Sequence, residues 1–150
     1  MLALVEGAHQ DGAPLVLTQE VHRLASVDFS RELDPGTASK VRRASRSYPS
    51  CATSLARTSC ASAAAFFATD LDLLLRGLGV RTVVACGYLT DVCVHYTCVD
   101  AHQHDYRVEV AADVCAGSSP SAHHAALAAI EYLQHGAVVR TDSVLAARRT

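Results

Sequence analysis

Cys93 is the residue of this chain whose position best suits covalent chemistry. The segment Gly87–Val94 (GYLTDVCV) follows an apolar, strand-like run and opens a helix-like run. In an open parallel sheet, ligands bind beyond the carboxyl ends of the strands, which is where such a segment lies. Thr90 is a suitable helix N-cap, and Asp91 suits the positive end of a helix. We therefore expect Cys93 in the first turn of a helix.

A thiol in the first turn of a helix can act as a nucleophile. The unpaired N–H groups and the helix dipole stabilise the thiolate there, and lower the pKa of a thiol from about 8.5 toward neutrality. The same N–H groups can hold an oxyanion. The alternative is that Cys93 is a small buried residue at a helix start, without a chemical role.

The other five cysteines form no motif. They are Cys51, Cys60, Cys86, Cys98 and Cys115. No pair has the C-x-x-C spacing of a zinc ribbon or a thioredoxin-like site. The start of the chain turns acidic too soon for a secretion signal, so we expect a reducing cytosol and free thiols. Cys86 and Cys98 are expected in the core.

The histidines suggest no metal site. His95 is two residues from Cys93 in the predicted helix, so we expect it to face away and not to act as its base. The others considered are His102, His104, His123 and His124. The last two are neighbours on one predicted helix and cannot easily face one metal. No set of three or four ligands converges, so we predict no metal and no other cofactor.

These residues must be positioned by alternating helices and strands. We expect helices at residues 2–11, 66–78, 90–104 and 119–135 and from 143 onward, and strands at 14–18, 81–86, 106–112 and 137–140. The helix at 66–78 would bury a stripe made of Phe66, Phe67, Leu71, Leu74 and Leu75. This alternation predicts a three-layer, doubly wound α/β fold, with a mostly parallel sheet between helices. It is Rossmann-like, but the sequence has no G-x-G-x-x-G dinucleotide fingerprint.

Composition limits the class of protein. The chain has 150 residues, 50% of them hydrophobic, which is enough for the core of one domain. The net charge of -2 and the scarcity of aromatic residues, at 5%, argue against a nucleic-acid partner. No apolar run reaches the length of a membrane helix. We expect a soluble, cytoplasmic domain without a membrane partner.

Residues 37–64 differ from the rest of the chain. No Asp or Glu occurs from Pro35 to Thr69, and serines are scattered through the segment without a period. The only large aliphatic residues of the segment are Val41 and Leu55. The simplest interpretation is a long basic surface loop, although structureless loops of this length are uncommon inside compact domains.

The segment Gly87–Thr97 (GYLTDVCVHYT) resembles the nucleophile segment of the isochorismatase-like cysteine hydrolases. This family includes nicotinamidases, N-carbamoylsarcosine amidases, and ureidoacrylate and biuret amidohydrolases. The likeness extends to residues 11–34, 66–76, 100–108 and 111–113 and covers most of the chain except 37–64. It implies an α/β fold with a Cys–Asp–Lys triad.

The resemblance assigns a reaction to Cys93. Its thiolate would attack the carbonyl carbon of a small amide or carbamoyl substrate, an amine would leave, and water would release the acid from a thioester. The peptide bond between Tyr88 and Leu89 would be cis, and the backbone N–H groups of Leu89 and Cys93 would form the oxyanion hole. The resemblance also implies a homo-oligomer. Family nicotinamidases hold zinc through an Asp and paired histidines, of which only His22 matches, so no metal is expected.

The sequence departs from the family in two places. By the resemblance, Met1 falls inside the family's first helix, so we expect an N-terminally truncated domain without the opening strand that ends in Asp-x-Gln. The family's Lys-Arg-Arg-Tyr-Ser-Ala falls on residues 60–65, which read CASAAA. No catalytic Asp or Lys can be assigned. The nearest substitutes along the chain are Glu20, Asp28, Asp70 and Arg57.

We hypothesise that residues 37–64 are translated out of frame. Regrouping GC-rich codons for residues 46–63 by one base permits a reading that resembles the family's helix, loop and strand leading to the lysine. A divergent loop is the alternative. The gene sequence separates the two, because the hypothesis requires a pair of compensating frame changes.

Three functions remain open from the sequence. The leading one is a cysteine amidohydrolase. The others are a catalytically inactive relative that binds a small molecule, and a structural subunit of a homo-oligomer. Ammonia release from a panel of amides separates the first from the other two.

Overall fold

The chain alternates helices and strands along its length. The computed structural model describes residues 1–20, 55–60 and 64–147. Its elements, in chain order, are α1 (Leu2–Gln10), β1 (Leu15–Glu20), β2 (Leu55–Cys60), α4 (Leu71–Gly77), β3 (Thr82–Tyr88), η1 (Thr90–Val94), α5 (His95–Gln103), β4 (Arg107–Ala116), α6 (Pro120–Leu133), β5 (Val138–Val139) and α7 (Thr141–Ala147). η1 is a π-helical turn that continues directly into α5.

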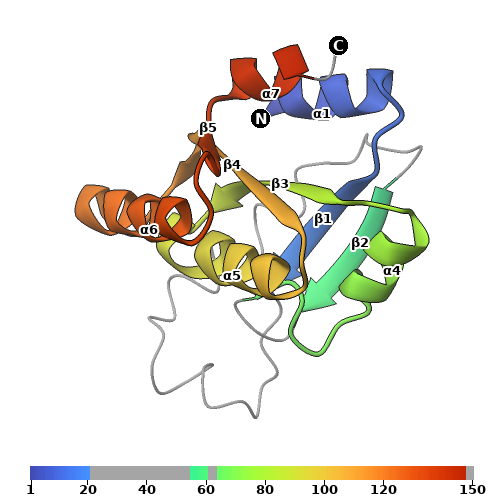
Figure 1. Cartoon of the computed structure of the whole chain (residues 1–150), viewed down its shortest axis with the longest axis horizontal. Coiled ribbons are helices and arrows are strands. Elements are labelled where there is room, and N and C mark those ends of the chain that lie inside the picture. Colours follow the sequence, from blue (N-terminus) through green and yellow to red (C-terminus); the bar gives the residue numbers. More distant parts are fainter. Residues whose placement is uncertain (21–54, 61–63, 148–150) are drawn as a thin grey trace.

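The strands lie between two layers of helices. Every strand pairing is parallel. Helices α1 and α7 lie together on one side of the strands, and α5 and α6 lie on the other (Figure 1). This arrangement confirms the predicted α/β class, with a parallel sheet covered on both faces.

The described strands form two hydrogen-bonded groups. One group is β1–β2, and the other is β3–β4–β5. The core includes Val108 and Val110 of β4, which are almost fully buried and belong to one cluster with Leu75 of α4 and Ile130 of α6. Val16 of β1 packs against the same core. The two groups of strands therefore share one core without sharing a hydrogen-bond ladder in the described part of the chain.

The helix expected at 66–78 is shorter than predicted and begins only at Leu71. Ala68 has a φ of 54°, in the left-handed region that interrupts a right-handed helix. The Thr69 hydroxyl donates to the carbonyl of Ala65 at 2.7 Å and fixes a turn there instead. Phe67 consequently points outward and is 66% exposed, which corrects its expected place in the core.

The segment 37–64 contains a strand that its sequence does not suggest. Strand β2 runs parallel to β1, from the pair Leu15 and Leu55 to the pair Glu20 and Cys60. The alternative of a continuous loop is therefore wrong at 55–60, whereas the out-of-frame hypothesis stays a prediction. Main-chain hydrogen bonds need no particular side chain, so a segment without alternating apolar residues can still complete a ladder. Residues 37–54 and 61–63 lie outside the described part.

Among the described residues, none of the helices combines the length and the apolar character needed to span a bilayer.

Candidate active site

Cys93 lies in the turn that follows strand β3. The strand ends at Tyr88, and η1 places Cys93 in its single turn, where the residue is partly buried. The carbonyl of Leu89 accepts from the N–H of Val92 at 3.2 Å and from that of Val94 at 3.1 Å. The peptide bond between Tyr88 and Leu89 is cis, at the position expected from the resemblance. Short π-helical turns recur at functional sites.

Thr90 is not the N-cap that its sequence position suggests. Leu89 has extended backbone angles and is the N-cap residue, without a side-chain cap hydrogen bond. Thr90 is already inside the turn and is completely buried. Its hydroxyl oxygen lies 2.9 Å from Nδ1 of His123 on α6, so it bonds to another helix and not to the start of its own.

Asp91 joins the same turn to the connection between β4 and α6. Its carboxylate accepts from the backbone N–H of Ser118 at 2.7 Å and also from the Ser118 hydroxyl. The Ser118 hydroxyl is the main cause that holds the pKa of the Asp91 carboxyl below its usual range. Asp91 lies in a first helical turn, and it also links η1 to the connection between β4 and α6.

Gly117 allows these two segments to approach. A Cβ at this position would lie 2.8 Å from Cβ of His123 and 2.9 Å from Oδ1 of Asp91. Both distances are shorter than real Cβ contacts. A glycine is required here by the close approach of its neighbours.

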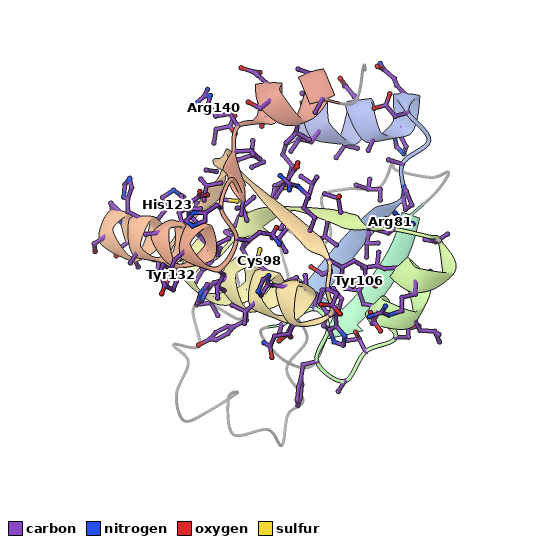
Figure 2. All side chains as sticks on the ribbon, viewed as in Figure 1. Arg81, Cys98, Tyr106, His123, Tyr132 and Arg140 are labelled. Carbon is purple, nitrogen blue, oxygen red and sulfur yellow. The ribbon has the colours of Figure 1, made fainter. Side chains whose placement is uncertain are left out.

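The described cysteines differ sharply in their surroundings. Cys98 of α5 (Figure 2) is 3% exposed, as expected, and burial raises the pKa of its thiol to about 12. Burial also raises the pKa of Cys115 to about 11. Cys86 is exposed, so its expected place in the core is wrong. Cys86 lies where the register of the β3–β4 pairing shifts, between Ala85 and Gly87. Such an irregularity interrupts the alternation of buried and exposed side chains along a strand.

The histidines have different hydrogen-bond partners, but the rings of His123 and His124 also contact each other, with 5.3 Å between their centroids. The His95 ring contacts that of Tyr96, with 5.6 Å between their centroids. His123 bonds to Thr90, whereas Nδ1 of His124 lies 2.6 Å from the carbonyl oxygen of Pro120. Figure 2 shows His123 on α6. Within residues 1–20, 55–60 and 64–147, no group of three His, Cys, Asp or Glu residues could hold a metal ion.

His104, which follows the end of α5, belongs to a structural cluster. The His104 ring stacks on Phe66 at 5.4 Å, and its Nδ1 lies 3.8 Å from Oδ1 of Asp72. The Tyr106 hydroxyl donates to the same carboxylate oxygen at 2.8 Å. His102 lies in the last turn of α5. This cluster joins α4 to the connection between α5 and β4.

Most candidate substitutes for the triad Asp and Lys, or their side chains, lie outside the part of the chain that the structure describes. Asp28 and His22 lie outside the described residues, as does the side chain of Glu20 at the end of β1. Arg57 lies in β2, and its side chain is not described either. Asp70 is the exposed residue that precedes α4.

His123 is the site residue that the sequence analysis missed. From the sequence, His123 is only one of two adjacent histidines that cannot easily face one metal. Its partner Thr90 is 33 positions away. No local pattern links them, although a histidine in the first turn of a helix that packs on the nucleophile turn is a recognisable candidate.

Comparison with known proteins gives consistent matches. The isochorismatase domain matches residues 2–143. Maleamate amidohydrolase of Pseudomonas putida is 38% identical over 82 residues, which are 55% of this chain and 38% of that protein. A ureidoacrylate amidohydrolase of Methylobacterium radiotolerans is 45% identical over 67 residues, 44% of this chain and 26% of that protein. The matched segments thus span well under half the length of these relatives.

Solved structures show the same fold. The crystal structure of a cysteine hydrolase from Pseudomonas syringae superposes with a TM-score of 0.78 at 22% identity. The match covers 99% of this chain and 78% of that one.

Proposed function

Because this chain belongs to the isochorismatase family, we propose that it is a cysteine hydrolase that cleaves the C–N bond of a small amide or carbamoyl compound. The observation that carries the proposal is the place of Cys93 in a π-helical turn at the carboxyl end of β3. Ligands of open parallel sheets bind at this end.

The proposed reaction forms and breaks one covalent bond to the enzyme. The Cys93 thiolate attacks the carbonyl carbon, and the backbone N–H groups of Leu89 and Cys93 stabilise the oxyanion. The C–N bond then breaks, the nitrogen leaves with a proton as ammonia or an amine, and the acyl group remains as a thioester. Water hydrolyses the thioester, releases the acid and restores the thiol.

The names of the relatives support the substrate class. Maleamate and ureidoacrylate differ in the rest of the molecule, but both amidohydrolases are named for breaking an amide-type C–N bond. We therefore expect the substrate to be small and to present such a bond to Cys93. A homo-oligomer is part of the proposal, from the family resemblance alone.

A second candidate is a catalytically inactive member of the family that keeps the fold. The sequence favours it at one point, since the stretch where the family has its lysine reads CASAAA at residues 60–65. Ala64 and Ala65 of this stretch are buried and carry no group that could assist a proton transfer.

An activated aryl ester tests the nucleophile apart from the missing triad residues. The good leaving group of p-nitrophenyl acetate needs no acid, so a thiolate with an oxyanion hole is acylated without help. We expect one acetyl group on the peptide that contains Cys93, and none on that peptide in Cys93→Ser. Acetylation spread evenly over the cysteines would contradict the proposal. Cys86→Ser is the matched control, because Cys86 is exposed and lies seven positions earlier.

A further inference from the structure

We propose that His123 is a positioning residue for Cys93 and that it acts through Thr90. The inference rests on the proposed role of Cys93 as a nucleophile. His123 Nδ1 lies 2.9 Å from the hydroxyl oxygen of Thr90, which is completely buried and stands three positions before Cys93 in the same turn.

Thr90 controls the geometry of the turn. It is the first residue of η1, and its carbonyl accepts from the N–H of His95, which follows the last residue of η1. Cys93 lies between these two ends. A shift of Thr90 therefore changes the π-helical hydrogen bond that closes the turn, and with it the direction of the Cys93 side chain and N–H.

The hydrogen bond to His123, and not packing alone, explains why a hydroxyl is present at the buried position of Thr90. A buried hydroxyl without a hydrogen bond costs free energy, so a valine of the same shape would suit an apolar site better. The hydroxyl is kept next to a histidine nitrogen that it can bond. The pair therefore fixes one rotamer of Thr90, which a purely apolar contact would not do.

Hydrogen bonds hold the start of α6 in place, so a contact with His123 can fix the position of η1. The Ser119 hydroxyl caps the helix by accepting from the N–H of Ala122 at 3.1 Å. The backbone N–H of His123 donates to the carbonyl of Ser119 at 2.9 Å. Beside this contact, Asp91 accepts two hydrogen bonds from Ser118. Two adjacent residues of η1 are thus held, Asp91 by the connection between β4 and α6 and Thr90 by the first turn of α6.

His124 provides a matched comparison on the same helix. It is exposed, and its Nδ1 bonds to Pro120 within the first turn of α6, with no hydrogen bond to η1. Its ring packs edge-on against that of His123, with 5.3 Å between the centroids. Loss of His124 therefore removes a neighbour of the His123 ring but leaves both groups of the Thr90–His123 hydrogen bond in place.

The test measures alkylation of Cys93 by iodoacetamide at neutral pH, mapped by peptide mass spectrometry, in the full chain. Thr90→Val and His123→Ala should each slow the labelling of Cys93 by about tenfold, the change expected when a thiol loses surroundings that stabilise its thiolate. Thr90→Ser keeps the hydroxyl and should restore the rate, as should His123→Asn, whose amide can replace Nδ1. The double variant Thr90→Val/His123→Ala should be no slower than either single variant, because both remove one interaction. His124→Ala should label at the original rate.

Cys98 reports general loosening in the same samples. It is 3% exposed, so a variant that merely unfolds more often should label Cys98 faster. Slower Cys93 labelling with unchanged Cys98 labelling supports a positioning role. Unchanged Cys93 labelling in Thr90→Val and His123→Ala overturns the positioning role and leaves the proposed nucleophile intact. Absence of preferential Cys93 labelling in the unaltered chain overturns both.

Discussion

The carboxylate of Asp91 accepts both the backbone N–H and the hydroxyl of Ser118, which stands 27 positions later in the chain. The pair fastens the turn that carries Cys93 to the connection between β4 and α6. Since the Ser118 hydroxyl lowers the pKa of Asp91, the pair also makes the attachment of this turn sensitive to acid.

The contribution of Asp91 to stability should depend on pH. Its folded-state pKa is lowered, so its stabilisation is present above the ordinary Asp pKa of about 3.9 and is lost as the pH falls through the lower folded value. Asp91→Asn should lower Tm at pH 7 by about 2–4 °C, as expected for one ordinary hydrogen bond. Thermal melts followed by circular dichroism should show this difference shrinking as the pH is lowered below the ordinary Asp pKa. An equal difference at pH 7 and at the lower pH would mean that the substitution acts through packing.

The thiols should react in a definite order. Cys93 should be alkylated fastest, because among the described cysteines it alone lies in a turn that opens a helix. Cys98 and Cys115 should be slowest, because their pKa values are raised to about 12 and about 11. Cys86 is exposed but has a raised pKa from desolvation and should fall between. Timed iodoacetamide labelling with peptide mapping gives the order, and faster labelling of Cys60 or Cys98 than of Cys93 would count against the site.

Gly117→Ala should disturb the site through its backbone. The added Cβ would meet the backbone and Cβ of His123 and the carboxylate of Asp91 at less than 3 Å. Such overpacking costs about 1–3 kcal/mol, so we expect a Tm lower by several degrees and slower labelling of Cys93. Gly77→Ala is the matched control, because no atom lies within 4 Å of a Cβ there. It ends a helix and should leave Tm unchanged or raise it slightly. Equal effects of the two substitutions would contradict the close packing around Gly117.

Much of the fold followed from short-range patterns. The apolar spacing near the start of the chain predicted α1, and Ser119-Pro120 predicted the start of α6, where the Ser119 hydroxyl is indeed the cap. The limits of the elements were less certain. The left-handed Ala68 that delays α4 has no sequence signal, because alanine favours helices. Strand β2 was missed, because its pairing depends on β1 and not on its own residues.

The sequence predicted the site residues that are close neighbours in the chain, but not the contacts between residues that are distant in the sequence. The segment around Cys93 could be found, because a strand is followed directly by a turn and the start of a helix. Thr90 was assigned as a cap from its position alone. Its real partner comes from a helix that starts 30 residues later, and only the packing of α6 on η1 decides that choice.

The two groups of strands predict a weakly cooperative fold. Among the described strands, β1 pairs only with β2, and β3 pairs only with β4, so each presents an edge without a partner. Unpaired edges favour association with other chains, and a shared core without a shared ladder couples the two groups weakly. Calorimetry should show a broad transition, and light scattering should show aggregation on heating. A sharp, reversible transition that fits two states would contradict this prediction.

The last prediction concerns turnover. Thiolate attack on an unactivated amide needs a base within hydrogen-bond reach and a group that protonates the leaving nitrogen. The family resemblance assigns neither the Asp nor the Lys to a residue of the given sequence, and general acid–base help is worth about 10²–10⁴-fold. We therefore expect the chain as given to release ammonia from a panel of amides at a rate near background.

A second arm supplies what the first lacks. A variant chain would carry the regrouped residues for 46–63, with their lysine, and an added first strand that ends in Asp-x-Gln. That strand would also give the open edges of β1 and β3 a partner, if it enters between them. We expect only this chain to release ammonia, and we expect Cys93→Ala to abolish the release, whereas Cys86→Ala should keep it. Robust turnover by the unaltered chain that disappears in Cys93→Ala would show that other residues complete the site. If neither chain releases ammonia while the aryl ester still acylates Cys93, the nucleophile works without the added residues. The defect would then lie in the added acid–base groups.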